Sequence, residues 1–368
     1  MRKFVRNILL IVNIVLVLIL VASYPAANIN PNDSAVWGPL GIVYPQIAFA
    51  NLFFIVFWLF FKKRFALLSL GALLLGWPRP KHLFQINGTD EVHDSSKAIK
   101  LLSYNVRLFN KYDWSKDNTI DERIFEFLDQ QNADIYCFQE FYDKKNKNEF
   151  LGFNLTKKAT ETKYLAFENM NDPRHSIKDR FFGLSIFSKF PVIKTETVFN
   201  AGTKARAIYA DILFHTDTLR VYNVHLKSLG FNPEEYAFIK DITQSSKEEQ
   251  IEQSKGVLKK LFNTFKERAD EANYLKAHIN NSPYPVILMG DFNETPYGFA
   301  YNTISKDLQD AFILKGNGTG ASFEGFGVLP SIQIDHMLLD NSFNVRDFTT
   351  FKIRLSDHEP ISGTVELK

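Results

Sequence analysis

The most informative segment of the chain reads Val286-Ile-Leu-Met-Gly290-Asp291-Phe-Asn293-Glu-Thr-Pro. Its apolar half has the composition of a buried strand, and Gly290 leads directly into Asp291 and Asn293, two polar residues spaced two apart. That spacing allows both side chains to point at one water molecule or phosphate oxygen. An ordinary turn stabilised by an Asp or Asn side chain is the alternative interpretation.

Polar residues close other apolar runs in the same way. Asn105 ends Leu101-Leu-Ser-Tyr-Asn105, where an amide on its own is typical of a turn or cap. Glu140 ends Asp134-Ile-Tyr-Cys-Phe-Gln139-Glu140, a run too apolar for an unpaired carboxylate. An oxygen-ligated divalent cation would explain Glu140, and a surface glutamate at a strand end is the alternative.

Two histidines extend the set of candidate site residues. His225 lies in Val221-Tyr-Asn-Val-His225-Leu-Lys, where alternation places it on the polar face of a strand. There it could donate to a phosphoryl oxygen or serve a structural role alone. Late in the chain, Ile332-Gln-Ile-Asp335-His336 and Leu355-Ser-Asp357-His358 supply two acidic residues and a histidine. A carboxylate hydrogen-bonded to the far nitrogen of His358 would fix its tautomer and make it a competent acid or base.

The region around these clusters alternates strands and helices. Short β-rich runs predict strands at 100–106, 133–138, 183–188, 208–214, 219–226, 286–289 and 333–339. Apolar residues at helical spacing predict helices at 120–131 and 247–280. We therefore expect an α/β domain whose strand ends present the polar residues to a common point.

The first 80 residues have a different composition. They contain three apolar runs, at 8–22, 47–61 and 65–77. The first run is either a membrane-spanning helix or the core of a signal peptide, and the third is short for a full span. We expect about three transmembrane helices in residues 1–80, a linker at 81–97 and a catalytic domain at 98–368.

Basic residues predict the orientation of this membrane region. Arg2, Lys3 and Arg6 precede the first run and residues 62–64 follow the second, whereas residues 28–37 contain no Lys or Arg. The positive-inside rule then places both basic clusters in the cytoplasm. With three spans the domain at 98–368 lies outside, as in a bacterial inner-membrane protein with a periplasmic domain, and an even number of spans would reverse this.

Charge and cysteine content argue against a protein that holds a long nucleic acid, a disulfide-linked fold and a thiolate metal cluster. Nine of the 43 Lys and Arg residues and four of the 41 Asp and Glu residues precede residue 98, so the remainder is slightly acidic. A protein that holds a long nucleic acid usually carries clustered positive charge. The single cysteine, Cys137, can form neither an internal disulfide nor a thiolate metal cluster, and we interpret it as a buried strand residue.

Over about residues 99–367 the chain resembles the endonuclease/exonuclease/phosphatase superfamily, which includes pancreatic deoxyribonuclease, inositol polyphosphate phosphatases and neutral sphingomyelinases; here it would be a membrane-anchored, bacterial-type member. Five motifs in order carry the resemblance: Ser103-Tyr-Asn105, Gln139-Glu140, Asn223-Val-His225-Leu, Gly290-Asp291-Phe-Asn293 and Ser356-Asp357-His358. Each motif alone is weak, and the ordered set is specific. The resemblance implies a four-layer αββα sandwich of two mixed β-sheets flanked by helices, here preceded by the transmembrane helices.

The resemblance also implies roles for the site residues. A Mg²⁺ or Mn²⁺ ion would be bound chiefly by Glu140, assisted by Asn105 and Asp357, and the absence of thiolates fits these ions independently. Among the catalytic residues, Asp291 would orient or deprotonate the attacking water, Asn293 and His225 would hold phosphoryl oxygens, and Asp335 would pair with His358. Whether Asp291 or His358 is the base stays open. Arg206 is a candidate phosphate ligand or a solvated strand-edge residue, and His336 stands where the family commonly has an aromatic residue.

We therefore expect a metal-dependent phosphoric ester hydrolase that cleaves a phosphodiester by in-line attack of an activated water. A phospholipid or sphingolipid substrate suits a site tethered to the bilayer, and it predicts exposed apolar side chains near residues 229–231. An extracytoplasmic nuclease is the alternative within the same chemistry. A membrane protein that binds a phosphorylated ligand without turnover is the alternative from another class.

Overall fold

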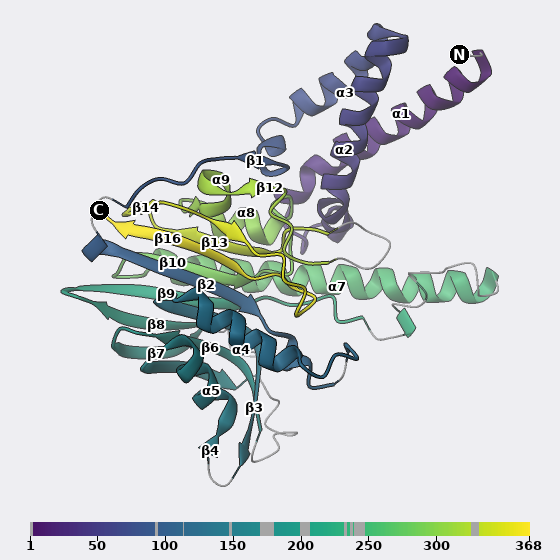
Figure 1. Ribbon diagram of the computed structural model, residues 1–368. Coiled ribbons are helices and arrows are strands. Elements are labelled where there is room, and N and C mark those ends of the chain that lie inside the picture. The colour runs from purple at the N-terminus through teal and green to yellow at the C-terminus, as the bar shows by residue number, and fades with distance from the viewer. Residues whose placement is uncertain are drawn as a thin grey trace.

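The computed structural model describes residues 3–92, 95–112, 114–146, 149–169, 180–198, 207–231, 234–235, 238, 247–324 and 331–368. Two β-sheets and the helices that flank them form the larger part of the molecule, and three apolar helices extend from it as an arm (Figure 1).

Both large sheets are mixed. One has the strand order β11-β13-β10-β9-β8-β7, in which β9 and β10 are parallel and the other pairs antiparallel. The other has the order β14-β16-β2-β3-β6-β5, in which β2 and β3 are parallel. The strands of the first are β7 (Val192–Val198), β8 (Ala207–Phe214), β9 (Asp217–His225), β10 (Val286–Asp291), β11 (Gln309–Asp310) and β13 (Asp335–Leu339). Those of the second are β2 (Ala98–Asn105), β3 (Ile135–Asn146), β5 (Tyr164–Asn169), β6 (Arg180–Ser188), β14 (Phe343–Val345) and β16 (Ile361–Leu367), joined at its margins by β4 (Glu149–Phe150) and β15 (Thr349–Thr350).

The main core lies between these sheets. Leu101, Cys137 and Ile186 of one sheet pack with Val221 and Ile287 of the other in a single fully buried cluster. These residues sit on alternate strand positions, so each sheet turns one apolar face inward. Cys137 is buried as expected from its apolar run.

Helices cover the outer faces of both sheets. On the β2–β3 sheet lie α4 (Ile120–Gln131) and α5 (Leu151–Thr160), with Ile124 and Leu128 buried against Tyr136. On the β9–β10 sheet lie α7 (Lys247–Asn280) and α8 (Phe299–Ser305), with Leu275 packed against Leu288. The predicted αββα sandwich is thereby confirmed.

Helix positions agreed with the sequence better than strand positions did. α4 and α7 have the predicted bounds, because their apolar spacing is a local property. The strands β5, β7 and β16 were not predicted. Four consecutive residues of the seven in β7 are exposed, and β16 contains Ser, Gly and Thr, so neither strand has a strong period-two pattern.

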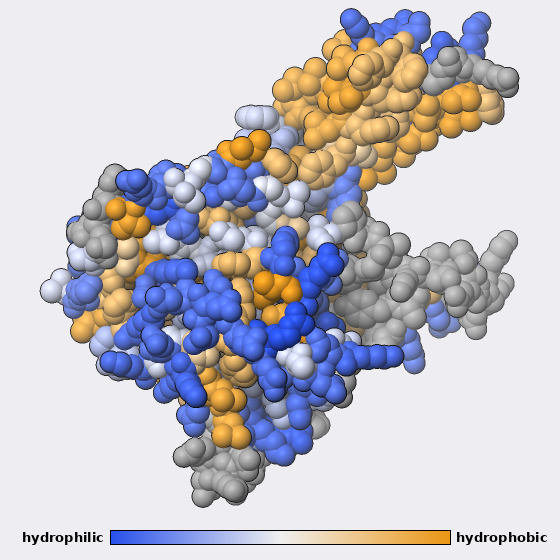
Figure 2. Space-filling model, viewed as in Figure 1, coloured by the Kyte–Doolittle hydropathy of each residue, from blue (hydrophilic) through white to orange (hydrophobic). Residues whose placement is uncertain are grey.

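The arm consists of α1 (Lys3–Ser23), α2 (Gly38–Phe61) and α3 (Lys63–Leu75). By length and composition two stretches, Lys3–Ala27 and Ala35–Phe61, are long and apolar enough to cross a membrane. α3 has 13 residues and measures about 20 Å, which is short of the roughly 30 Å hydrocarbon layer. Figure 2 shows that the arm presents a broad hydrophobic surface with hydrophilic residues at its far tip.

A polar network joins the three helices of the arm. Asn13 Nδ2 donates to Ser69 Oγ at 2.7 Å, and Ser69 Oγ donates to Asn51 Oδ1 at 2.8 Å. Trp58 Nε1 donates to Asn13 Oδ1 at 2.9 Å. All four side chains are fully buried, so α1, α2 and α3 pack as one unit.

The remaining elements are short and connect the larger ones. They are η1 (Tyr24–Ala27), η2 (Ala35–Trp37), η3 (Arg79–His82), η4 (Ser95–Lys97), η5 (Arg107–Asn110), α9 (Ala311–Lys315), β1 (Gln85–Ile86) and β12 (Asn317–Gly318). β1 pairs with β12, so the segment after the arm packs on the sandwich.

Candidate active site

Three neighbouring strands of the β9–β10 sheet carry polar residues at one edge. In the parallel pair β9–β10, His225 is the register partner of Asp291. In the antiparallel pair β10–β13, Asp335 is the partner of the same residue. Strand pairing therefore places an imidazole and two carboxylates side by side, although they are far apart in sequence.

Gly290 allows β10 and β9 to approach each other just before Asp291. Its φ is +144°, a conformation that side chains rarely adopt. A Cβ atom at this position would lie 2.0 Å from the carbonyl oxygen of Val224 in β9. The glycine in the Gly-Asp-Phe-Asn motif is thus required by backbone packing.

The other sheet contributes Asn105 and Glu140. Asn105 is the last residue of β2 and is paired in parallel register with Gln139 of β3. Glu140 follows in β3, where the pairing with β6 shifts register and φ is +49°. Such a bulge changes the direction of a side chain. The Glu140 carboxylate faces the opposite sheet, with Oε1 3.9 Å from His225 Nε2.

Two fully buried amides hold the sheets together beside the site. Gln139 Nε2 donates to Asn223 Oδ1 at 2.7 Å, across the interface between β3 and β9. Asn223 Nδ2 donates to the carbonyl oxygens of Phe138 and Ser185, at 2.8 and 2.9 Å. Because these residues adjoin Glu140 and His225 in sequence, the amides set the separation of those two side chains.

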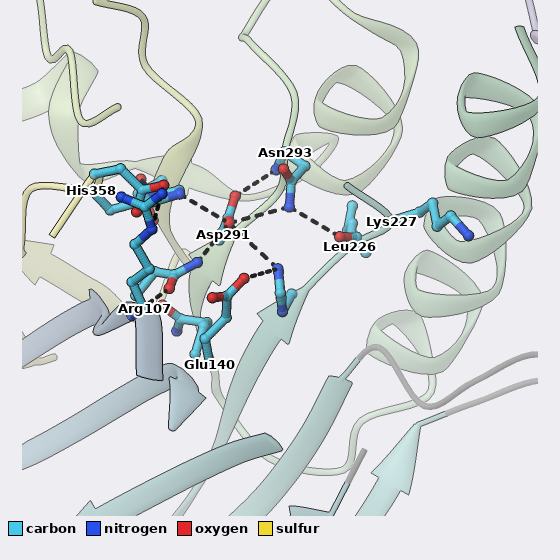
Figure 3. A network of polar contacts seen from close by, with 12 residues as sticks. Arg107, Glu140, Leu226, Lys227, Asp291, Asn293 and His358 are labelled. Carbon is cyan, nitrogen blue, oxygen red and sulfur yellow. Dashed lines mark hydrogen bonds and ion pairs between the residues drawn. The ribbon is translucent and has the colours of Figure 1, made fainter. Parts of the chain in front are cut away.

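Asp291 is the centre of the polar network (Figure 3). Its Oδ1 accepts from the backbone N–H of Asn293 at 2.7 Å. Its Oδ2 accepts from Asn105 Nδ2 at 3.1 Å and Asn293 Nδ2 at 3.2 Å. The Nε2 atoms of His225 and His358 each lie 3.6 Å from the same oxygen. Burial raises the pKa of this carboxyl above its ordinary value, and the positive charge of His358 opposes the shift.

His358 lies between two carboxylates. Its Nδ1 is 2.9 Å from Asp335 Oδ2, and its Nε2 faces Asp291. Burial disfavours the charged imidazole, but Asp335 and Asp291 outweigh it and raise the pKa of His358 to about 10. The ring is therefore held as an imidazolium by a carboxylate at each nitrogen.

Glu140, Asp357 and Asn105 offer a set of oxygen donors for a cation. Burial, and after it the negative charge of Asp357, raises the pKa of Glu140 to about 7. The ionised form of Glu140 is thus disfavoured in the site as it stands, and a bound cation would favour it. Arg107 Nε lies 3.3 Å from Asp357 Oδ2. Oxygen ligands without a thiolate suit Mg²⁺ or Mn²⁺. The residues present fit a divalent cation.

A second group of potential ligands is explained without a cation. Ligand atoms of Asp291, Asp335 and His358 all lie within 4.8 Å of one another. Their proximity follows from the hydrogen bond between His358 and Asp335 and from the charge attraction between His358 and Asp291. The interactions of His358 therefore account for the proximity of these three residues without a bound ion.

A cavity of about 160 Å³ is lined by both polar and apolar residues. The polar lining residues are Glu140, His225, Asp291, Asn293, Asp357 and His358. The apolar ones are Ile42, Leu229, Phe323, Ile332 and Ile334. A cavity of this kind can hold a charged phosphoryl group through its polar lining while an apolar substituent contacts the apolar residues.

The structure brings together all eight residues that the sequence predicted for catalysis and metal binding: Asn105, Glu140, His225, Asp291, Asn293, Asp335, Asp357 and His358. Arg206 lies outside the described residues. His336 is buried, with its ring 4.8 Å from that of Phe292 and 4.6 Å from that of Tyr301. It fills an aromatic position, and its Nε2–H donates to the Glu294 carbonyl oxygen at 3.0 Å.

Arg107 is the site residue to which sequence reasoning gave no role. It follows Asn105 by two residues, but its φ of +44° and its contact with Asp357 depend on a turn that has no glycine to indicate it. Gln139 and Asn223 were noted only as parts of motifs. Their bridge joins two sheets, so no local pattern could predict it.

A sandwich of two mixed sheets with this donor set at one end defines a metal-dependent phosphoric ester hydrolase. The chain belongs to the Endonuclease/Exonuclease/phosphatase family, whose model matches residues 102–358. A domain of unknown function (DUF8431) matches residues 6–83. No curated protein matches the chain. The family predicted from the five motifs is thus confirmed.

Solved structures of many other proteins are similar to this chain, among them two from bacteria. An endonuclease/exonuclease/phosphatase family protein from Leptotrichia buccalis is 16% identical with a TM-score of 0.50, covering 73% of this chain and 100% of its own. One from Bacteroides thetaiotaomicron is 15% identical with a TM-score of 0.51, covering 74% of this chain and 98% of its own. At these identities the likeness shows the shared fold.

Proposed function

We propose that the protein is a membrane-anchored phosphodiesterase that binds Mg²⁺ or Mn²⁺ and hydrolyses the head-group diester of a phospholipid or sphingolipid. One observation carries the proposal: donors from three separate segments, Asn105, Asn293 and His358, converge on Asp291 beside Glu140. This arrangement can bind a phosphoryl group and direct a water molecule at it.

Each residue has a role that follows from its contacts. Asp291 accepts the proton of the attacking water, because burial raises the pKa of its carboxyl and the surrounding N–H donors fix its position. His358 cannot serve as the base while carboxylates face both of its nitrogens, so it donates to a phosphoryl oxygen. His225 and Asn293 hold the remaining phosphoryl oxygens, and Asp335 orients His358.

Glu140, Asn105 and Asp357 would hold the divalent cation. When bound, such an ion neutralises charge on the phosphoryl oxygens and acidifies a coordinated water. Arg107 would keep Asp357 in place through their ion pair.

The arm supports a membrane location for the domain 1–80 and an outer location for the domain 98–368. Tyr24 Oη donates to the Ala72 carbonyl oxygen at 2.6 Å, so α3 brings the chain back to the end where α1 finishes. Lys3, Arg6 and residues 62–64 lie at the opposite end, the hydrophilic tip in Figure 2. Three helices thus put the basic residues on one side and the sandwich on the other, as the positive-inside rule requires with the tip in the cytoplasm.

A lipid substrate is favoured over nucleic acid by the apolar residues that line the cavity. Leu229 is one of these residues and is 9% exposed, and the Phe231 ring lies 5.5 Å from Lys260 Nζ. These side chains face the cavity or a neighbour, so residues 229–231 do not form the exposed apolar patch that the sequence suggested. The apolar contact is inside the site.

The test is Mg²⁺-dependent hydrolysis by the full chain, reconstituted in vesicles, on panels of phospholipids, sphingomyelin, DNA, RNA and phosphomonoesters. His358→Ala is the control for the site. Lipid turnover that this variant loses supports the proposal. Turnover of nucleic acid alone would contradict the lipid proposal and favour an extracytoplasmic nuclease. Metal binding without turnover of any substrate would favour a membrane protein that binds a phosphorylated ligand.

A further inference from the structure

The outer end of α2 is packed directly on the catalytic domain. At Gly38, the first residue of α2, a Cβ atom would lie 2.6 Å from the Phe265 ring of α7. At Gly41 it would lie 3.0 Å from the Tyr297 carbonyl oxygen and 3.3 Å from Gly298 Cα. The two glycines, one turn apart, let the helix backbone approach the sandwich closely.

Specific contacts fix α2 to the loop that follows Asp291 and Asn293. Thr295 is 1% exposed, and its Oγ1 donates to the Gly41 carbonyl oxygen at 2.8 Å. The rings of Tyr44 and Tyr297 stack with centroids 4.0 Å apart. The first two turns of α2 are therefore held in register with the residues that carry the chemistry.

Ile42 lies between these two contacts and lines the active-site cavity. It lines the cavity together with the apolar residues Leu229, Ile332 and Ile334 and the polar residues Glu140 and His358. A helix of the arm, from the part of the chain that precedes the catalytic domain, therefore contributes one of the residues that line the site.

The position of the cavity along α2 matches the position of a lipid phosphate. Phe49 and Phe53 are 41% and 62% exposed and lie about 10 Å and about 16 Å beyond Ile42 along the helix. The head-group zone of one leaflet is roughly 5–8 Å thick. With these phenylalanines in hydrocarbon, the cavity lies near the level of the phosphates, and the exposed apolar side chains of α2 lie farther along the same helix, on an arm whose surface is broadly hydrophobic (Figure 2).

We propose that Ile42 is a specificity-determining residue: it contacts the apolar part of a phospholipid that is still in the bilayer, while its phosphodiester reaches Asp291. The helical arm is then part of the substrate site as well as an anchor. This inference rests on the proposed phosphodiesterase function and goes beyond it, because it assigns substrate selection to α2.

The experiment compares two substrates with the same scissile bond. One is phosphatidylethanolamine with phosphatidylglycerol in the vesicles that hold the full chain, and the other is the pair of glycerophosphodiesters left after removal of their acyl chains. We expect Ile42→Asn to lower about tenfold the ratio of kcat/KM for the lipid to kcat/KM for the deacylated diester. The cause would be a higher KM for the lipid. Ile42→Leu keeps an apolar contact and should restore the ratio.

Val36→Asn is the matched control. Val36 lies just before α2 and is 59% exposed, but it does not line the cavity, so the same substitution there should leave both rates unchanged. An unchanged ratio in Ile42→Asn, or an equal loss on both substrates, would overturn the role of Ile42 and leave the phosphodiesterase standing. Wild-type turnover of neither substrate would overturn both.

Discussion

His358 Nδ1 lies 2.9 Å from Asp335 Oδ2, and both side chains are buried beside the cavity. The bond joins the last loop of the chain to the first residue of β13. It fixes the direction in which Nε2 points, because a ring nitrogen with a carboxylate partner cannot rotate away without losing a charge-assisted hydrogen bond.

Asp335→Asn should therefore slow turnover by about 10²-fold with little change in metal affinity. The substitution removes the charge that holds the His358 imidazolium but keeps the shape of the side chain. Steady-state kinetics measure the effect. Asp340→Asn, just beyond the other end of β13, is the control, and a comparable loss there would point to general damage to the strand.

Asp291→Asn should lower kcat about 10³-fold, since the amide cannot accept the proton of the water. Cation binding should persist, because Glu140 and Asp357 are unchanged. Single-turnover kinetics with calorimetric metal titration separate the two effects. If the variant kept wild-type kcat, the assignment of Asp291 as base would be wrong.

Removal of divalent cations should abolish turnover, and Glu140→Gln should raise the Mg²⁺ concentration needed for half-maximal activity about tenfold or more. The reason is that the variant lacks the principal anionic ligand. Mn²⁺ binding followed by electron paramagnetic resonance checks the affinity directly. Glu126→Gln, exposed on α4 and far from the ligand set, should behave as wild type.

The buried His336 should make stability depend on pH. Burial lowers its pKa to about 4 from an ordinary 6.5, so below pH 6.5 the unfolded chain binds a proton that the folded protein does not. The contribution of His336 to the free energy of unfolding is complete above pH 6.5 and is lost as the pH falls toward 4. The loss is about 2 kcal/mol at pH 5.

The thermal unfolding midpoint in detergent at pH 7.5 and at pH 5 measures this dependence. His336→Phe keeps the aromatic packing and has no titratable ring, so its midpoint should fall less between the two values than that of the wild type. Equal decreases in the two proteins would contradict the assignment.

Asn13→Leu should destabilise the helical arm by about 1 kcal/mol, because it leaves Trp58 Nε1 without its acceptor and removes the donor to Ser69 Oγ, which keeps only its bond to Asn51. Unfolding of the detergent-solubilised protein measures the loss. Asn7→Leu is the matched control, since Asn7 is exposed on the same helix. Equal effects at the two positions would argue against the network.

The sequence alone was enough to determine the family, the sandwich, the bounds of α4 and α7, and the eight polar residues at strand ends. The family and the sandwich followed from the resemblance carried by the five ordered motifs. The helix bounds and the polar positions depend on local order: apolar spacing defines helix faces, and a polar residue that follows an apolar run marks the edge of a sheet. The sequence showed that His336 departs from the family pattern, but it did not predict that the His336 ring packs against other aromatic rings.

The tertiary structure decided which of these atoms meet and what else reaches the site. The Gln139–Asn223 bridge sets the separation of the sheets, and Arg107 contacts Asp357 through a turn with positive φ. Ile42 belongs to an apolar run that by composition indicates only a membrane helix, yet it lines the active-site cavity. Such contacts join residues distant in sequence, and their geometry follows from the packing of whole sheets and helices, which no local pattern encodes.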